Sequence, residues 1–137
     1  MNIGLKMGEL IKSIGKRIDE ALGGEESALS MEYFFLLNIL YGRTDVIQHD
    51  LANIMKKDKS GVLRQIDLLE ELKLVVRVPD TDDRRRKAIV LTDAGVKKVE
   101  KFRQIEADIF NGLLEGISQK DLEVFDSVLD KMKSKTS

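Results

Sequence analysis

The sequence contains no cysteine, and its only histidine is His49. The absence of cysteine excludes disulfide bonds, thiolate metal sites and a redox-sensing thiol within these residues. One histidine is too few for an ordinary zinc site or a Ser-His-Asp triad, and we expect His49 at a helix start or on the surface. Glycine loops of the kind that bind phosphate are also missing. The sequence therefore predicts neither an enzyme nor a cofactor or metal site.

Long apolar runs are absent as well, because no stretch approaches the roughly 18 residues that a membrane span requires. The first residues lack the pattern of a secretory signal. These two observations predict a soluble cytoplasmic protein with no membrane partner. Positive charge is not in excess either: 23 Lys and Arg face 24 Asp and Glu, for a formal net charge of −1. A surface that binds nucleic acid would therefore require local segregation of charge.

Helical periodicity is what the sequence does contain. Apolar residues recur at spacings of three and four, which predicts amphipathic helices. Ser30, Asp58, Thr92 and Ser118 are suited to cap helix starts, and glycines at 23–24, 42 and 116 are suited to end helices. The expected helices cover residues 7–22, 31–41, 49–55, 58–72, 92–115 and the segment after 118.

The periodicity changes after residue 72. Segments 75–78 and 88–91 are rich in β-branched residues and flank a polar turn, so we expect a β-hairpin with a charged tip. Residues 46–47 could add one short strand. Two short helices joined by a turn and followed by such a hairpin form a winged helix-turn-helix, within a mainly α fold. The second helix of the pair then fits the major groove of DNA, and the hairpin, or wing, reaches the backbone or the neighbouring minor groove.

Charge is segregated in the same region. Residues 56–87 contain ten basic and seven acidic residues, a net of +3, so the rest of the chain carries −4. Positive charge is therefore concentrated where the winged fold would meet DNA, as electrostatic binding to phosphates requires.

Several short motifs in this region resemble the MarR (multiple antibiotic resistance regulator) family. The most diagnostic is Asp83-Arg84-Arg85, followed at the right distance by residues 90–95, Val-Leu-Thr-Asp-Ala-Gly. Each motif is weak alone, but their order and spacing together are specific, and they span about half of the chain. The other matching pieces are Leu29-Ser30, Asp50-Leu51-Ala52, residues 58–62 (Asp-Lys-Ser-Gly-Val) and Leu69-Glu70.

The resemblance implies a homodimer that regulates transcription, most often as a repressor on a pseudo-palindromic operator. It implies dimerisation through residues 1–29 and 93–137 and DNA binding through residues 30–92. In such proteins the wing arginine, here Arg85, enters the minor groove, and the aspartate, here Asp83, supports it. A small aromatic effector that releases the DNA is also implied, although the sequence names no residues for it.

Candidate DNA contacts lie on the second helix of the pair and on the wing. Serine and lysine suit phosphates, whereas arginine and glutamine can read base edges. The alternatives are that these are ordinary solvated residues, or that the winged fold serves as a protein-interaction module. The candidates are Lys57, Lys59, Ser60, Gly61, Arg64, Gln65, Arg84, Arg85 and Arg86, with Asp83 as wing support.

Three residues depart from the family pattern. Lys73 stands where a glycine usually ends the recognition helix, and a left-handed backbone there costs lysine about 1 kcal/mol relative to glycine. Gly61 replaces a frequent threonine and could let the backbone approach DNA. Leu63 is apolar where a polar base contact is common, and it could meet a thymine methyl. These departures affect the expected operator sequence rather than the fold.

Overall fold

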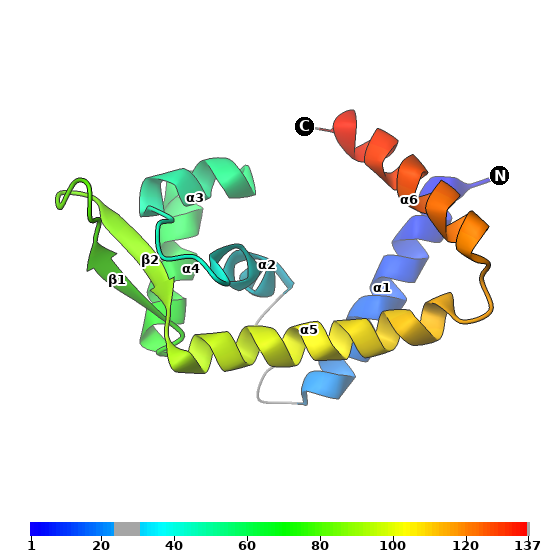
Figure 1. Cartoon of the computed structure of the whole chain (residues 1–137), viewed down its shortest axis with the longest axis horizontal. Coiled ribbons are helices and arrows are strands. Elements are labelled where there is room, and N and C mark those ends of the chain that lie inside the picture. Colours follow the sequence, from blue (N-terminus) through cyan, green and yellow to red (C-terminus); the bar gives the residue numbers. More distant parts are fainter. Residues whose placement is uncertain (24–30, 137) are drawn as a thin grey trace.

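The computed structural model describes residues 1–23 and 31–136. Over these residues the chain forms helices at both ends and a winged helix-turn-helix between them, joined by one long helix (Figure 1). The predicted fold class is confirmed. The elements are α1 (Ile3–Leu22), α2 (Met31–Leu40), α3 (Gln48–Met55), α4 (Lys59–Glu71), β1 (Val75–Pro79), β2 (Lys87–Leu91), α5 (Asp93–Leu114) and α6 (Gln119–Ser134).

Most helix boundaries match the periodicity, with one extension at the N-terminus. Helix α1 begins at Ile3 rather than residue 7, because the Asn2 side chain accepts a hydrogen bond from the Leu5 N–H at 3.0 Å. Asp58, Thr92 and Ser118 cap helices as expected, each accepting from the N–H three residues later. The predicted cap Ser30 and the predicted stop Gly24 lie outside the described residues.

The core lies where α2, α4 and α5 meet. Helix α2 is apolar almost all round, and Phe34, Leu36, Leu37 and Leu40 are buried. The Phe34 ring stacks on Phe102 of α5 with their centroids 4.4 Å apart, so α5 is part of the winged domain's core at its N-terminal half. Other buried members are Ile18, Leu22, Leu51, Val62, Ile66, Leu69, Val75, Ile89 and Val99.

The wing is an antiparallel pair in which Val75 faces Leu91 and Pro79 faces Lys87. The expected strand at 46–47 is reduced to an isolated bridge between Ile47 and Ala88. A close approach joins the wing to α5: a Cβ on Gly95 would lie 2.1 Å from the Leu74 carbonyl oxygen. Glycine at this position is therefore required for α5 to start against β1.

Both helices of the pair end in the same way, with a lysine in the left-handed region. Lys56 ends α3 with φ 53°, and Lys73 follows α4 with φ 62°. The Leu74 N–H then donates to the Leu69 carbonyl and the Lys73 N–H to the Glu70 carbonyl, both at 2.9 Å, which is the Schellman pattern. The usual left-handed end of the recognition helix is thus kept although the glycine is absent.

Candidate nucleic-acid interface

The start of α4 is fixed by Asp58. Its carboxylate accepts the Gly61 N–H at 3.1 Å and the Ser60 hydroxyl. The Ser60 hydrogen bond, followed by that of Gly61, holds the pKa of Asp58 below its usual value, so the cap stays ionised at neutral pH. Ser60 is exposed, but its hydroxyl proton is directed to the cap, which leaves its oxygen to accept rather than donate.

The exposed face of α4 carries two of the predicted cations. Lys59 and Arg64 are exposed, and Leu63 lies between them with 37% of its surface accessible. Lys59 and Leu63 also border a hollow of about 200 Å³ against α3, together with His49. An exposed helix face with two cations, one apolar side chain and an adjacent hollow has the composition that a recognition helix presents to a major groove.

Three predicted contacts are not presented to solvent as expected. Gln65 is buried with 4% exposure, which corrects the expectation that it reads base edges. Gly61 is also buried, so its backbone does not offer the close approach that we expected. Lys57 Nζ lies 2.6 Å from the Glu32 carboxylate of α2 and is engaged within the protein.

Arg77 of β1 ties the wing to the recognition helix. Its guanidinium donates to Asp67 at 2.6 Å and to Glu70 at 2.7 Å, both on α4, and to Gln48 of α3 at 2.8 Å. The side chain retains only 20% exposure. Arg77 is one of the ten basic residues counted between residues 56 and 87. In the folded protein its charge is bound by carboxylates of α4, and it fixes the angle between the wing and that helix.

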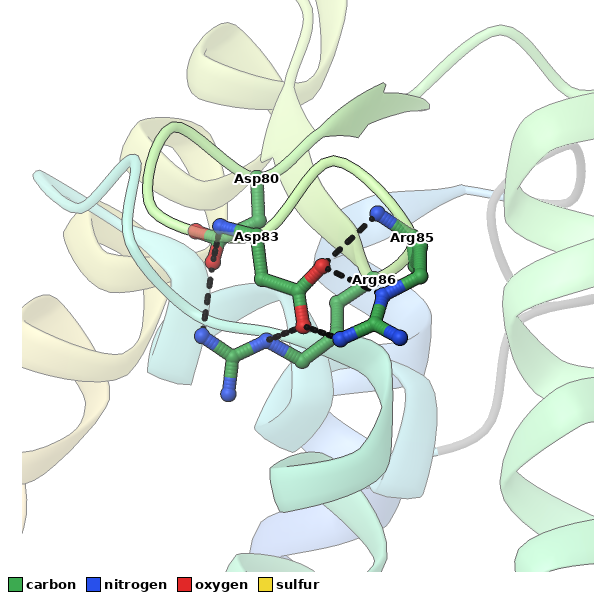
Figure 2. Close-up of polar contacts among 4 residues, drawn as sticks. All are labelled: Asp80, Asp83, Arg85 and Arg86. Carbon is green, nitrogen blue, oxygen red and sulfur yellow. Dashed lines mark hydrogen bonds and ion pairs between the residues drawn. The ribbon is translucent and has the colours of Figure 1, made fainter.

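The tip of the wing holds two aspartate–arginine pairs (Figure 2). Asp83 Oδ1 accepts from Arg85 Nε at 3.1 Å and Oδ2 accepts from Arg85 Nη2 at 3.3 Å, a bidentate arrangement. The same carboxylate also accepts the Arg85 backbone N–H. These bonds hold the pKa of Asp83 below its usual value. The Arg85 side chain is nevertheless 91% exposed, so its orientation is fixed while its far side is open.

The second pair supports the turn itself. Asp80, whose side chain is 9% exposed, accepts from Arg86 Nη2 at 2.9 Å. Arg86 is therefore partly neutralised inside the tip, whereas Arg84 is exposed with no hydrogen-bond or ion-pair partner among residues 1–23 and 31–136. Asp80 was missed by the sequence analysis, and its position opening a turn before the basic run was the available signal.

A cavity of about 640 Å³ lies between α2 and α5, behind the helix-turn-helix. Phe34, Phe35 and Phe102 line it, with Glu32 and Glu106 at its polar edges. Arg103, another lining residue, is held by Asn38 at 2.7 Å and lies 4.1 Å over the Tyr41 ring. Volume and aromatic lining are those of a small-molecule site. No sequence pattern predicted this cavity, because its walls come from helices more than 60 residues apart.

Among residues 1–23 and 31–136, no helix combines the length and the apolar composition of a membrane span. Nor does this part of the chain hold a group of three acidic or histidine side chains that could bind a metal ion.

Comparisons with known proteins agree with this geometry. A sequence model of the MarR family matches residues 29–86. The HTH-type transcriptional regulator YdgJ of Bacillus subtilis is 26% identical over 123 residues, which cover 90% of this chain and 72% of YdgJ. The structure of the Staphylococcus aureus MepR–DNA complex matches with a TM-score of 0.81 at 27% identity, covering 98% of each chain. MepR bound to ethidium bromide matches with a TM-score of 0.68 at 27% identity, covering 100% of this chain and 98% of that one. The chain therefore matches the MarR family in sequence over residues 29–86, and over nearly its whole length it has the winged helix-turn-helix fold of the DNA-bound regulator MepR.

Proposed function

We propose that a homodimer of this chain binds a pseudo-palindromic operator in duplex DNA and represses transcription until a small aromatic effector releases it. In this proposal residues 30–92 bind the DNA, and residues 1–29 and 93–137 form the dimer. The observation that carries the proposal is the wing tip, where Asp83 orients an arginine that is 91% exposed. A planar, weakly hydrated guanidinium suits the narrow minor groove.

Charges on α4 support the proposal. Lys59 and Arg64 are exposed on the helix that a winged fold inserts into the major groove. The similar MepR has been solved in complex with DNA, and its fold matches over nearly the whole chain. Binding should be dominated by phosphate contacts and should therefore weaken steeply with salt.

Replacing the wing arginine tests the proposal. We expect Arg85→Ala to weaken duplex binding on the order of tenfold and to lower the salt slope by about 1.8, because each dimer loses two cations from the DNA, one per wing, at about 0.9 each. Fluorescence anisotropy against salt concentration, on an operator found by selection from random duplexes, measures both. Lys131→Ala on α6 is the matched control and should change neither. Undiminished affinity in Arg85→Ala would remove the assigned role, and a wild-type protein without salt-dependent binding would favour the interaction module.

The cavity between α2 and α5 supports the effector part of the proposal. Its aromatic walls suit a flat ligand, and the similar MepR has been solved with ethidium bromide. A ligand acts on DNA affinity only if it binds two conformations of the dimer differently. A thermal-shift screen of small aromatic compounds, followed by DNA-release assays on the hits, tests this. A complete absence of hits that also release DNA would contradict effector control.

A further inference from the structure

Glu32 of α2 holds a lysine that belongs to the turn of the helix-turn-helix. Lys57 Nζ lies 2.6 Å from Glu32 Oε1, although the two residues are 25 positions apart in sequence. The Lys57 side chain is 29% exposed and that of Glu32 is 48% exposed. The ammonium is therefore at the surface near the start of the recognition helix, but it is already bound by a carboxylate.

The start of α4 is shaped to let the lysine reach this carboxylate. A Cβ built on Gly61 would lie 2.8 Å from Lys57 Cε and 3.0 Å from Asp58 Oδ1. The lysine chain therefore passes directly over the position where any other residue would carry a side chain. This gives the buried Gly61 a role inside the protein, in place of the DNA approach expected from the sequence.

A second group from α4 converges on the same carboxylate. The Gln65 side chain is buried one turn after Gly61, and its interaction with Glu32 helps to lower the pKa of that carboxyl. The Lys57 hydrogen bond, as the largest cause, together with the Gln65 interaction, holds the pKa of Glu32 below its usual value, so Glu32 is ionised at neutral pH. Glu32 thus binds Lys57, the one of these two side chains that is partly exposed near the recognition helix.

An ammonium bound to a carboxylate at this distance is not free for a phosphate, because both are anions that compete for the same point charge. We propose that Glu32 is an internal competitor of DNA for Lys57, which lowers the affinity of the protein for its operator. This inference rests on the proposed DNA binding and adds to it a residue, outside the helix-turn-helix, that sets the strength of binding. The exposed Lys59 and Arg64 remain available in the same state.

Glu32→Gln tests the proposal with little change in shape. The amide keeps an oxygen that can accept from Gln65, but it no longer holds the ammonium by charge. We expect duplex affinity to rise about threefold to tenfold, and the slope of log affinity against log salt to steepen by about 1.8, as each of the two protomers neutralises one further phosphate at about 0.9 each. Anisotropy titrations of the full-length protein on the selected operator, at four or more salt concentrations, give both values.

Three further variants separate release of the lysine from simple removal of a negative charge. Lys57→Gln should change affinity less than about twofold, because the wild-type lysine is withheld from DNA. The double variant Glu32→Gln/Lys57→Gln should lose the whole gain of Glu32→Gln. Glu71→Gln removes one exposed carboxylate at the other end of α4 and should leave the salt slope unchanged. Circular dichroism melts of all variants confirm that each is folded.

Clear outcomes would overturn the inference. One is a large loss of affinity in Lys57→Gln with a slope lowered by about 1.8, because both lysines of the dimer would then already be on the DNA. Another is a Glu32→Gln gain that is absent, or that persists in the double variant. Failure of the proposed function has a different signature: the wild type itself would show no salt-dependent duplex binding, and Arg85→Ala would have no effect.

Discussion

At the scale of single residues, Lys73 is one of the two lysines of the winged domain that adopt a left-handed backbone. With φ 62° it occupies the left-handed region in which a Cβ crowds the following carbonyl. The conformation persists because it closes α4: the Lys73 carbonyl accepts the Thr92 hydroxyl at 2.7 Å, and the next N–H returns to Leu69. The helix end is therefore set by its surroundings rather than by the preference of the residue.

Lys73→Gly should consequently stabilise the protein. We expect the free energy of unfolding to rise by about 1 kcal/mol, because glycine adopts this conformation without strain. Urea denaturation followed by circular dichroism measures the change. Lys97→Gly, in the interior of α5, is the matched control and should lower stability by about 1 kcal/mol. Equal destabilisation by both variants would contradict the role given to Lys73.

The burial of Gln65 shows which part of the site was predictable. Gln65 lies three residues after Val62 and four before Leu69, so it shares the apolar face of α4, and the spacing already pointed it inward. Glutamine can read base edges, so its residue type suggested that Gln65 contacts DNA. Its position on the apolar face indicated burial in the core, and burial is what the structure has. The partners of Lys57 and Arg77 were not predictable in this way, because Glu32 and Asp67 are brought to them by tertiary packing alone.

At the scale of elements, the sequence predicted the helices that start with a capping side chain. Helices α4, α5 and α6 begin where Asp58, Thr92 and Ser118 indicated, since a cap is a local interaction. The first turn of α1 was missed although Ile3, four residues before Met7, continues the apolar stripe of this helix. The cap of Asn2 was the remaining indication.

The Asp58 cap makes part of the stability dependent on pH. Its pKa is lowered in the folded state from a usual value of 3.8, so its contribution is complete above that value and is lost as pH falls through the lower, folded pKa. Asp58→Asn keeps a capping oxygen that does not ionise. We expect the wild type to lose more stability than Asp58→Asn between pH 5 and pH 2, measured as the difference in melting temperature.

A second aspartate that does not cap a helix serves as the control for the acid dependence of the Asp58 cap. Asp126→Asn on α6, whose carboxylate has no hydrogen-bond partner within residues 1–23 and 31–136, should leave the acid dependence as in the wild type. A parallel loss of melting temperature in wild type and Asp58→Asn would mean that the cap does not contribute to the acid dependence.

At the scale of the whole molecule, the terminal helices expose a large apolar surface. Helix α6 buries none of its residues completely, yet it is amphipathic. Exposed apolar surface on this scale is typical of an interface, and it supports the proposed dimer. Its members are Ile3, Leu5, Leu10 and Ile11 of α1, Phe110 of α5, Ile117, and Val124, Phe125, Val128 and Met132 of α6.

Phe125→Glu should disrupt the dimer. A carboxylate in an apolar interface is desolvated without a partner, and loss of an aromatic anchor costs about 2 kcal/mol or more, so the dissociation constant should rise at least about thirtyfold. Sedimentation equilibrium measures it, and DNA affinity should fall in parallel. Ser127→Glu adds the same charge on the polar face of α6 and should leave the dimer intact. A wild type that sediments as a monomer would contradict the proposal.

Helix α5 runs without a break from the end of the wing to the region of α1 (Figure 1). Its 22 residues correspond to a rod of about 33 Å. A tilt of about 6° at one end of such a rod moves the other end by about 3.4 Å, the rise of one base pair. In the proposed dimer, a rotation of α5 at its α1 end would therefore displace the wing by about one base-pair step along the DNA.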